Sequence, residues 1–145
     1  MISTVLAALD HTERAPRVLR AASEIADRFD AVLRIFRAVP LVQTFPAAAS
    51  NAAHPDALPE YLRIEAVHAM EALALALGNP RAMAHPPIVS VGNPVRAILA
   101  AADSINADLI VLGSHGLHGL DHLFGTVTGT VTVRSARNVF VVHSD

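Results

Sequence analysis

The stretch ADLIVLGSHGLHGLDHLFGT, residues 107–126, joins an apolar run to the densest group of glycines in the chain. Its first part, Asp108–Gly113, is predicted to be a β-strand, because such an apolar run is typical of strands covered on both faces, as in a parallel sheet. Residues 113–126 hold four of the seven glycines and three of the eight histidines of the chain. So much bare main chain after a strand fits a turn, a phosphate site or a metal site.

Four further segments are predicted to be strands, because each is short, apolar and followed by a turn signal. Two of them, Thr4–Leu9 and Asn138–His143, are rich in aliphatic and β-branched residues. The other two are Ala31–Val39, which two arginines interrupt, and Pro87–Gly92.

Helical patterns separate these strands. Apolar residues recur at helical spacing in three segments: Arg14–Phe29, Pro59–Leu77 and Asn93–Ile105. The β-branched residues after residue 125 favour a strand by propensity, but a strand there would leave no crossover after residue 113. We therefore predict a helix over Thr126–Ser135. Strands that alternate with single helices indicate an open α/β fold with a parallel sheet.

Composition narrows the class of protein further. With 145 residues, of which 52% are hydrophobic and 17% charged, the chain is expected to form a single domain over residues 1–145. All of its basic residues are arginines, which excludes a Walker-type phosphate lysine and a Schiff-base lysine. The absence of cysteine excludes disulfides, thiolate nucleophiles and cysteine-ligated metal sites.

Charge and the N-terminal sequence bear on partners and location. The net charge of −2 gives no broad attraction to nucleic acid or to an anionic membrane, and no apolar run approaches the roughly 20 residues of a membrane span. Residues 1–10 lack the basic start of a signal peptide. We expect a cytoplasmic protein without nucleic-acid or membrane partners. The stretch Gln43–Ala57 has no periodicity, and it fits either a mobile flap that binds a partner or an excursion without function.

Two strand ends carry residues suited to a ligand. Asp10 and Gly113 each stand at the predicted carboxyl end of a strand, where ligands bind in open α/β sheets. A glycine there lets main-chain N–H groups approach a phosphate, and Gly125 with Thr126 would place further amides at the start of a helix. Turn formation alone accounts for the glycines equally well. As an alternative to binding a ligand, Asp10 only caps the turn into the next helix, through Thr12.

These residues resemble the universal stress protein family, and the likeness covers the whole chain. The main motif is GSHG followed, after a gap of eight residues, by GTV, and it lies between the apolar segments ADLIVL and NVFVV. Asp10 and the sequence VGNP at Val91–Pro94 also match the family. The resemblance implies an open five-stranded parallel sheet with strand order 3-2-1-4-5 and helices on both faces, Rossmann-like and adenine nucleotide alpha hydrolase-like. It also implies that Asp10 and Gly113 flank one crevice.

Members of that family that bind ATP carry a glycine, two residues, a glycine, nine residues, and then a glycine with serine or threonine. This chain matches by residue type, but eight residues separate the second glycine from the third. The resemblance implies an adenine nucleotide, and we expect ATP with Mg²⁺ bridging its phosphates, because no lysine offsets their charge. The implied contacts lie at strand ends and in the glycine-rich stretch: Ala8, Asp10, Ala38, Val39, Leu112, Gly113, Ser114, His115, Gly116, Gly125, Thr126 and Val127. Ala8 stands where ATP-binding members often have proline.

The expected function is that of a regulator of the stress response. We expect little catalysis beyond slow ATP hydrolysis, because Arg134 and Arg137 lie at the far end of the last helix from the phosphates. The last strand is an apolar edge, and the family resemblance implies a homodimer through it. The residues of that interface would be Val139, Phe140, Val141 and Val142.

Two other functions are compatible with the sequence. A shortened glycine-rich loop that closes the crevice would leave a nucleotide-free dimeric interaction module of the same fold. His115, His118 and His122 have the spacing of a metal site on one helical face. They are solvated loop histidines in the alternative interpretation, because Gly116 and Gly119 weaken any helix at this point.

Overall fold

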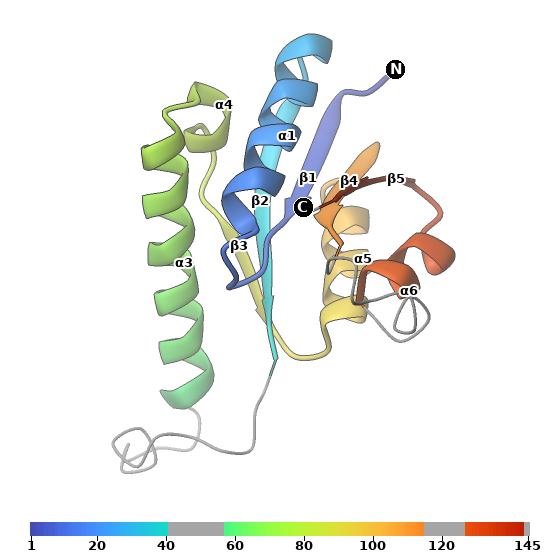
Figure 1. Ribbon diagram of the computed structural model, residues 1–145. Helices are drawn as coiled ribbons and strands as arrows, with labels where there is room; N and C mark the ends of the chain where they lie inside the picture. Colours follow the sequence, from blue (N-terminus) through green and yellow to red (C-terminus); the bar gives the residue numbers. More distant parts are fainter. Residues whose placement is uncertain (41–56, 115–126, 144–145) are drawn as a thin grey trace.

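The computed structural model describes residues 1–40, 57–114 and 127–143, in which strands and helices alternate (Figure 1). Its strands are β1 (Thr4–Ala8), β2 (Val32–Val39), β3 (Ile88–Val91), β4 (Leu109–Gly113) and β5 (Asn138–Val142). Its helices are α1 (Ala15–Phe29), α3 (Ala57–Leu77), α4 (Pro80–Met83), α5 (Pro94–Ser104) and α6 (Val127–Arg134). Each strand and helix predicted from the sequence is present, within two residues of its predicted ends.

The five strands form one parallel sheet in the order β3-β2-β1-β4-β5. This arrangement confirms both the predicted fold class and the strand order that the family resemblance implies. β1 lies at the centre, where its residue Ala7 pairs with Ile35 of β2 and with Val111 of β4. The carboxyl ends of β1, β2 and β4 therefore meet at one end of the sheet.

Helices cover both faces of this sheet (Figure 1). α1, α3 and α4 contribute to the core on one face, and α5 and α6 contribute to the core on the other. Along β1, Val5 and Ala7 belong to the first core, while Leu6 and Ala8 belong to the second. Successive strand residues are all buried because both faces are covered, which accounts for apolar runs without polar alternation.

α6 is helical although its composition favours a strand. The Thr128 hydroxyl donates to the main-chain oxygen of Gly113 (2.6 Å), and the Thr132 hydroxyl donates to that of Thr128 (2.7 Å). Val131 is fully buried in the core that α5 and α6 share. Packing on the sheet and the threonine hydrogen bonds thus override the local strand propensity, as the argument from chain connectivity predicts.

α4 is the helix that the sequence reasoning did not predict. The side chain of Asn79 accepts hydrogen bonds from the main-chain N–H groups of Arg81 (2.9 Å) and Ala82 (3.3 Å), and so begins the helix. The Arg81 guanidinium then binds the carboxylates of Asp27 (2.9 Å) and Asp30 (2.6 Å) at the end of α1. This short helix is therefore fixed by a tertiary ion pair.

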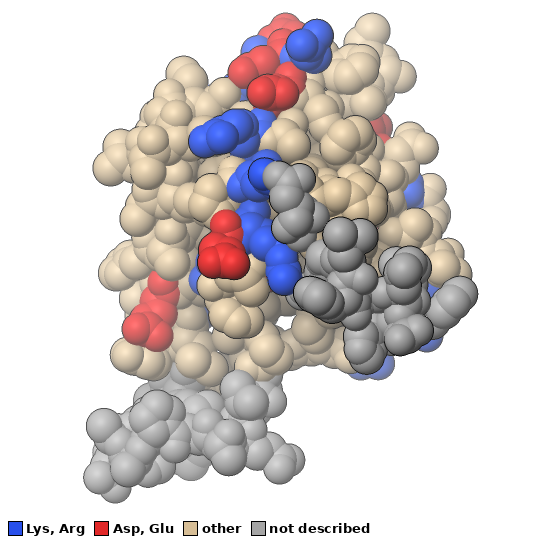
Figure 2. Space-filling view, in the orientation of Figure 1, with Lys and Arg blue, Asp and Glu red and all other residues tan. Residues whose placement is uncertain are grey.

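Arginine side chains gather along α1 on the face shown in Figure 2, with acidic side chains near the end of that helix. Most of the remaining described surface in this view carries no charge. Within residues 1–40, 57–114 and 127–143, no helix is both long enough and apolar enough to cross a membrane. Of the predicted loop Gln43–Ala57, only Ala57 falls within the described residues, as the first residue of α3.

Candidate functional site

A pocket of about 660 Å³ lies at the carboxyl ends of β1, β2 and β4. Its volume falls within the range of small-molecule sites, and its place is where ligands bind in open parallel sheets. The helices α3, α5 and α6 complete its walls. Predicted site residues from four separate parts of the chain meet in its lining: Ala8, Asp10, Ala38, Val39, Leu112, Gly113 and Val127.

Small apolar side chains shape the side of the pocket next to α5. Ala8 of β1 and Ala38 of β2 follow Leu6 and Phe36 on the sheet face that α5 covers. Their methyl groups leave room that a larger side chain would fill, and Ile98 of α5 lines the same space. This wall suits a flat apolar group, such as the face of an aromatic base.

The tip of β4 and the start of α6 lie together at the pocket. Gly113 and Val127 both line it, and the Thr128 hydroxyl bridges to the main-chain oxygen of Gly113 (2.6 Å). A Cβ atom on Gly113 would lie 3.0 Å from Cγ2 of Val18 on α1. The glycine thus permits close packing of α1 on β4, and it leaves main-chain atoms at the pocket wall.

Asp10 caps the turn into α1 through Thr12, one of the two roles that the sequence left open, and it also lies in the wall of the pocket. It lines the pocket, and its Oδ1 accepts hydrogen bonds from the main-chain N–H of Thr12 (2.9 Å) and from the Thr12 hydroxyl (2.6 Å). The hydroxyl oxygen of Thr12 accepts in turn from the N–H of Arg14 (3.2 Å). The carboxylate is therefore held in one orientation by the turn that leads into α1.

Arg37 is a candidate site residue that the sequence analysis missed. It lines the pocket, and its Nη2 donates to the main-chain oxygen of Asp10 (2.9 Å). Its Nε is buried without a hydrogen-bond partner among the described residues. Partial burial lowers the pKa of the Arg37 guanidinium from its ordinary value, while the Asp10 carboxylate raises it. The available signal was an arginine near the carboxyl end of a strand, the second of the two arginines that interrupt it.

Two further charged or titratable side chains line the pocket outside the predicted set. Glu65 comes from α3, and His11 follows Asp10 after β1. Residue Glu65 could have been found only by knowing which turn of α3 covers the strand ends. The described lining thus carries two carboxylates, one guanidinium and one imidazole.

Ser114 lies beside β5 and is not part of the pocket lining. Its main-chain N–H donates to the oxygen of Val142 (2.9 Å), and its hydroxyl lies 3.2 Å from Nδ1 of His143. That N–H is therefore engaged within the sheet. The predicted contacts His115, Gly116, Gly125 and Thr126 lie outside the described residues.

The expected metal alternative also lies outside the described residues, because His118 and His122 belong to the same undescribed stretch as His115. Among residues 1–40, 57–114 and 127–143, no three histidine, aspartate or glutamate side chains are grouped as a metal site. Arg137 was expected to be remote from the pocket. It lies just before β5, at the opposite end of the strand from the pocket, where it donates to Asp103 (3.2 Å) and to the main-chain oxygen of Ala107.

Comparison with known proteins places these features in a family. The model of the universal stress protein family matches residues 1–143. Universal stress protein A homolog 2 of Coxiella burnetii is 35% identical over 139 residues, which cover 96% of this chain and 92% of that protein.

Solved structures of universal stress proteins are similar to this chain over nearly its whole length. The universal stress protein UspA from Lactobacillus plantarum has a TM-score of 0.71 at 26% identity, with 97% of each chain covered. A universal stress protein described in complex with cAMP has a TM-score of 0.69 at 28% identity, with 99% of each chain covered.

Proposed function

Because this chain belongs to the universal stress protein family, we propose that it binds an adenine nucleotide in the pocket at the ends of β1, β2 and β4. The observation that carries the proposal is the pocket itself, in which Ala8, Asp10, Ala38 and Gly113 converge from distant parts of the chain. The cAMP complex of a structural relative supports the class of ligand. In this role the protein is a cytoplasmic, single-domain regulator of the stress response.

Different parts of the pocket lining suit the base, the ribose and the phosphates of a nucleotide. The apolar wall of Ala8, Ala38 and Leu112 suits the base, and the fixed Asp10 carboxylate accepts a hydrogen bond from the exocyclic amine or from the ribose. The phosphates lie at the tip of β4 and the start of α6, where main-chain N–H groups and the helix dipole favour an anion. His115, Gly116, Gly125 and Thr126, which lie outside the described residues, are proposed to make the remaining contacts to the phosphates.

ATP with Mg²⁺ is the form that we propose. Mg²⁺ in nucleotide sites is held largely by phosphate oxygens and water, with one or two carboxylates. The cation would offset phosphate charge in a chain that has no lysine.

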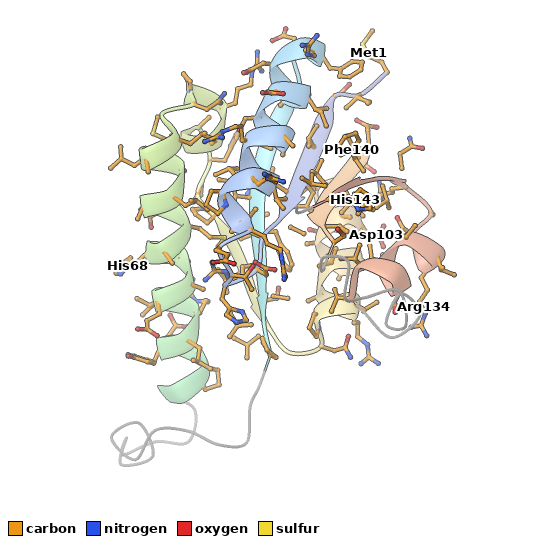
Figure 3. The ribbon with its side chains drawn as sticks, viewed as in Figure 1. Met1, His68, Asp103, Arg134, Phe140 and His143 are labelled. Atoms are coloured by element: carbon orange, nitrogen blue, oxygen red, sulfur yellow. The ribbon has the colours of Figure 1, made fainter. Side chains whose placement is uncertain are left out.

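We also propose a homodimer through β5. β5 ends the sheet and pairs only with β4 among the described residues, so its outer main-chain groups are available to a second chain. Phe140, labelled in Figure 3, comes from this strand and is 47% exposed. Val139, Val141 and Val142 would complete the apolar contact.

A thermal-shift titration tests the nucleotide proposal. Nucleotide at one hundred times its Kd should stabilise the folded protein by about 2.7 kcal/mol, which raises Tm by several degrees. Ala38→Leu fills the apolar wall and should abolish the shift, whereas Ala72→Leu, on the exposed side of α3, should keep it. Mass spectrometry of ligand released from protein purified without added nucleotide would identify the bound species.

One observation favours the second candidate, a nucleotide-free dimeric interaction module. The N–H of Ser114, one of the amides expected at the phosphates, is already bonded to Val142. The two functions separate in the same titration. A wild-type Tm that no adenine nucleotide raises, together with a stable dimer, would support the module and refute the nucleotide site.

A further inference from the structure

We propose that Arg37 is the residue by which this pocket selects a phosphorylated nucleotide over the uncharged nucleoside. The inference rests on the proposed function, since it concerns the same pocket. It adds a specificity residue that neither the glycine pattern nor the family comparison assigns.

The position of Arg37 follows from strand alternation. Leu33 and Ile35 pack into the core beneath α1 and α3, so Arg37 lies on the same face of β2, two residues further along. An apolar residue would be expected there. The chain instead places a guanidinium where β2 leaves the core and the pocket begins.

Contacts hold this guanidinium at the pocket but do not exhaust its donors. Nη2 donates to the main-chain oxygen of Asp10 (2.9 Å), which fixes one side of the group at the tip of β1. Nε is buried and has no hydrogen-bond partner among the described residues. An arginine has five N–H donors, of which the described residues engage one, and the buried Nε lies out of a ligand's reach, so the guanidinium acts on an anion mainly through its charge.

The charge of Arg37 is also incompletely offset by its surroundings. Burial lowers the pKa of Arg37 more than the Asp10 carboxylate raises it, so the charged guanidinium is less stable in this site than it would be in bulk water. A phosphate entering the pocket would supply the missing negative charge. An uncharged nucleoside would not.

Arg37 supplies the one permanent positive side-chain charge of the described pocket lining. Among the described lining residues, Arg37 is the only arginine, while Asp10 and Glu65 are carboxylates, and the chain has no lysine. β2 and β4 flank β1, so two strand spacings, about 10 Å, separate Arg37 from the phosphate end at Gly113. At that distance a unit charge changes anion affinity roughly ten-fold, and partial exposure to solvent reduces this to about five-fold.

The test compares the affinities of AMP and adenosine by isothermal titration calorimetry. Arg37→Gln should lower the ratio of AMP affinity to adenosine affinity about five-fold, and Arg37→Lys should restore part of it. Arg34→Gln is the matched control, because Arg34 lies on the same strand but does not line the pocket. Arg37→Met, which keeps the apolar stem, replaces the glutamine variant if that variant does not fold.

Each outcome has a defined meaning. A ratio that stays unchanged in Arg37→Gln or Arg37→Met overturns the inference, as does an equal loss of affinity for both ligands, which would indicate a purely structural role. If wild-type protein binds neither AMP nor ATP, the proposed function itself fails and this inference with it. Binding by wild type with a lowered ratio in the variant supports both, whereas a raised ratio overturns the inference.

Discussion

Replacing Gly113 by alanine would add one methyl group at the end of β4, between the sheet and α1. The new Cβ would lie 3.0 Å from Cγ2 of Val18, closer than the roughly 3.5–4.0 Å of ordinary carbon contacts. Val18 is only 4% exposed and belongs to the core beneath α1, so its side chain has little room to move. We therefore expect overpacking rather than a filled cavity.

The magnitude follows from two opposing effects. Alanine is favoured over glycine within a strand by roughly 0.5–1 kcal/mol, because it loses less conformational entropy on folding. Overpacking in a well-packed core costs about 1–3 kcal/mol. The net expectation for Gly113→Ala is a loss of about 1 kcal/mol in the free energy of unfolding, measured by urea denaturation.

A second variant tests whether Val18 is the cause. Val18→Ala alone should cost about 2–3 kcal/mol, from two buried carbons and the cavity that they leave. In the double variant the methyl group on residue 113 occupies part of that cavity, so the combined loss should be smaller than the sum by about 1 kcal/mol. Additive losses, or a Gly113→Ala variant at least as stable as wild type, would refute this packing argument.

Three further predictions test other contacts. Asp108→Asn should destabilise the fold at pH 7, because two main-chain N–H groups at the start of β1 hold the pKa of Asp108 below its ordinary value of 3.8. A carboxylate whose pKa is lower in the folded state than in the unfolded state contributes its full stability only at a pH above the unfolded-state pKa. The difference in free energy of unfolding between the variant and wild type should therefore vanish as the pH falls through the folded-state pKa of Asp108. A difference that urea titrations show to be independent of pH would contradict this. Thr128→Val should lower the free energy of unfolding by about 1–2 kcal/mol, because the main-chain oxygen of Gly113 loses the hydrogen bond from the Thr128 hydroxyl. Thr132→Val, at an exposed position, is the control and should lower it by less in the same urea denaturation assay. Phe140→Lys should convert the proposed dimer to a monomer in sedimentation velocity, because a charge on an edge strand opposes pairing, and an unchanged dimer would place the interface elsewhere.

The fold could be predicted from the sequence because its local and global signals agree. Thr4–Ala8 and Leu109–Gly113 are apolar throughout their buried parts because helices cover both faces, and the alternation of such strands with single helices indicates an α/β fold. α6 is the instructive case, since its propensity indicates a strand and only connectivity indicates a helix. α4 was missed because Gly78-Asn79-Pro80 indicates the end of the preceding helix, and the same Asn79 and Pro80 then begin a helix of only four residues whose Arg81 contacts α1.

The candidate site was predictable only where strand ends define it. Asp10, Leu112 and Gly113 follow from knowing where parallel strands stop. Arg37 could not be assigned in the same way, because a strand arginine is ordinarily an exposed residue, and only the tertiary structure shows that this one is half-buried and lines the pocket. Glu65 is a surface residue of a long helix by its pattern, and only the packing of that helix brings it to the pocket.

The unusual use of arginine connects these observations. A chain without lysine has only arginine side chains to offer a phosphate a permanent positive charge. Arg37 is the arginine among the described residues that line the pocket, and the main-chain oxygen of Asp10 holds its Nη2 there. A cation near two carboxylates favours a ligand that carries both hydrogen-bond donors and negative charge. An adenine nucleotide has both, whereas adenosine lacks the charge and inorganic phosphate lacks the base.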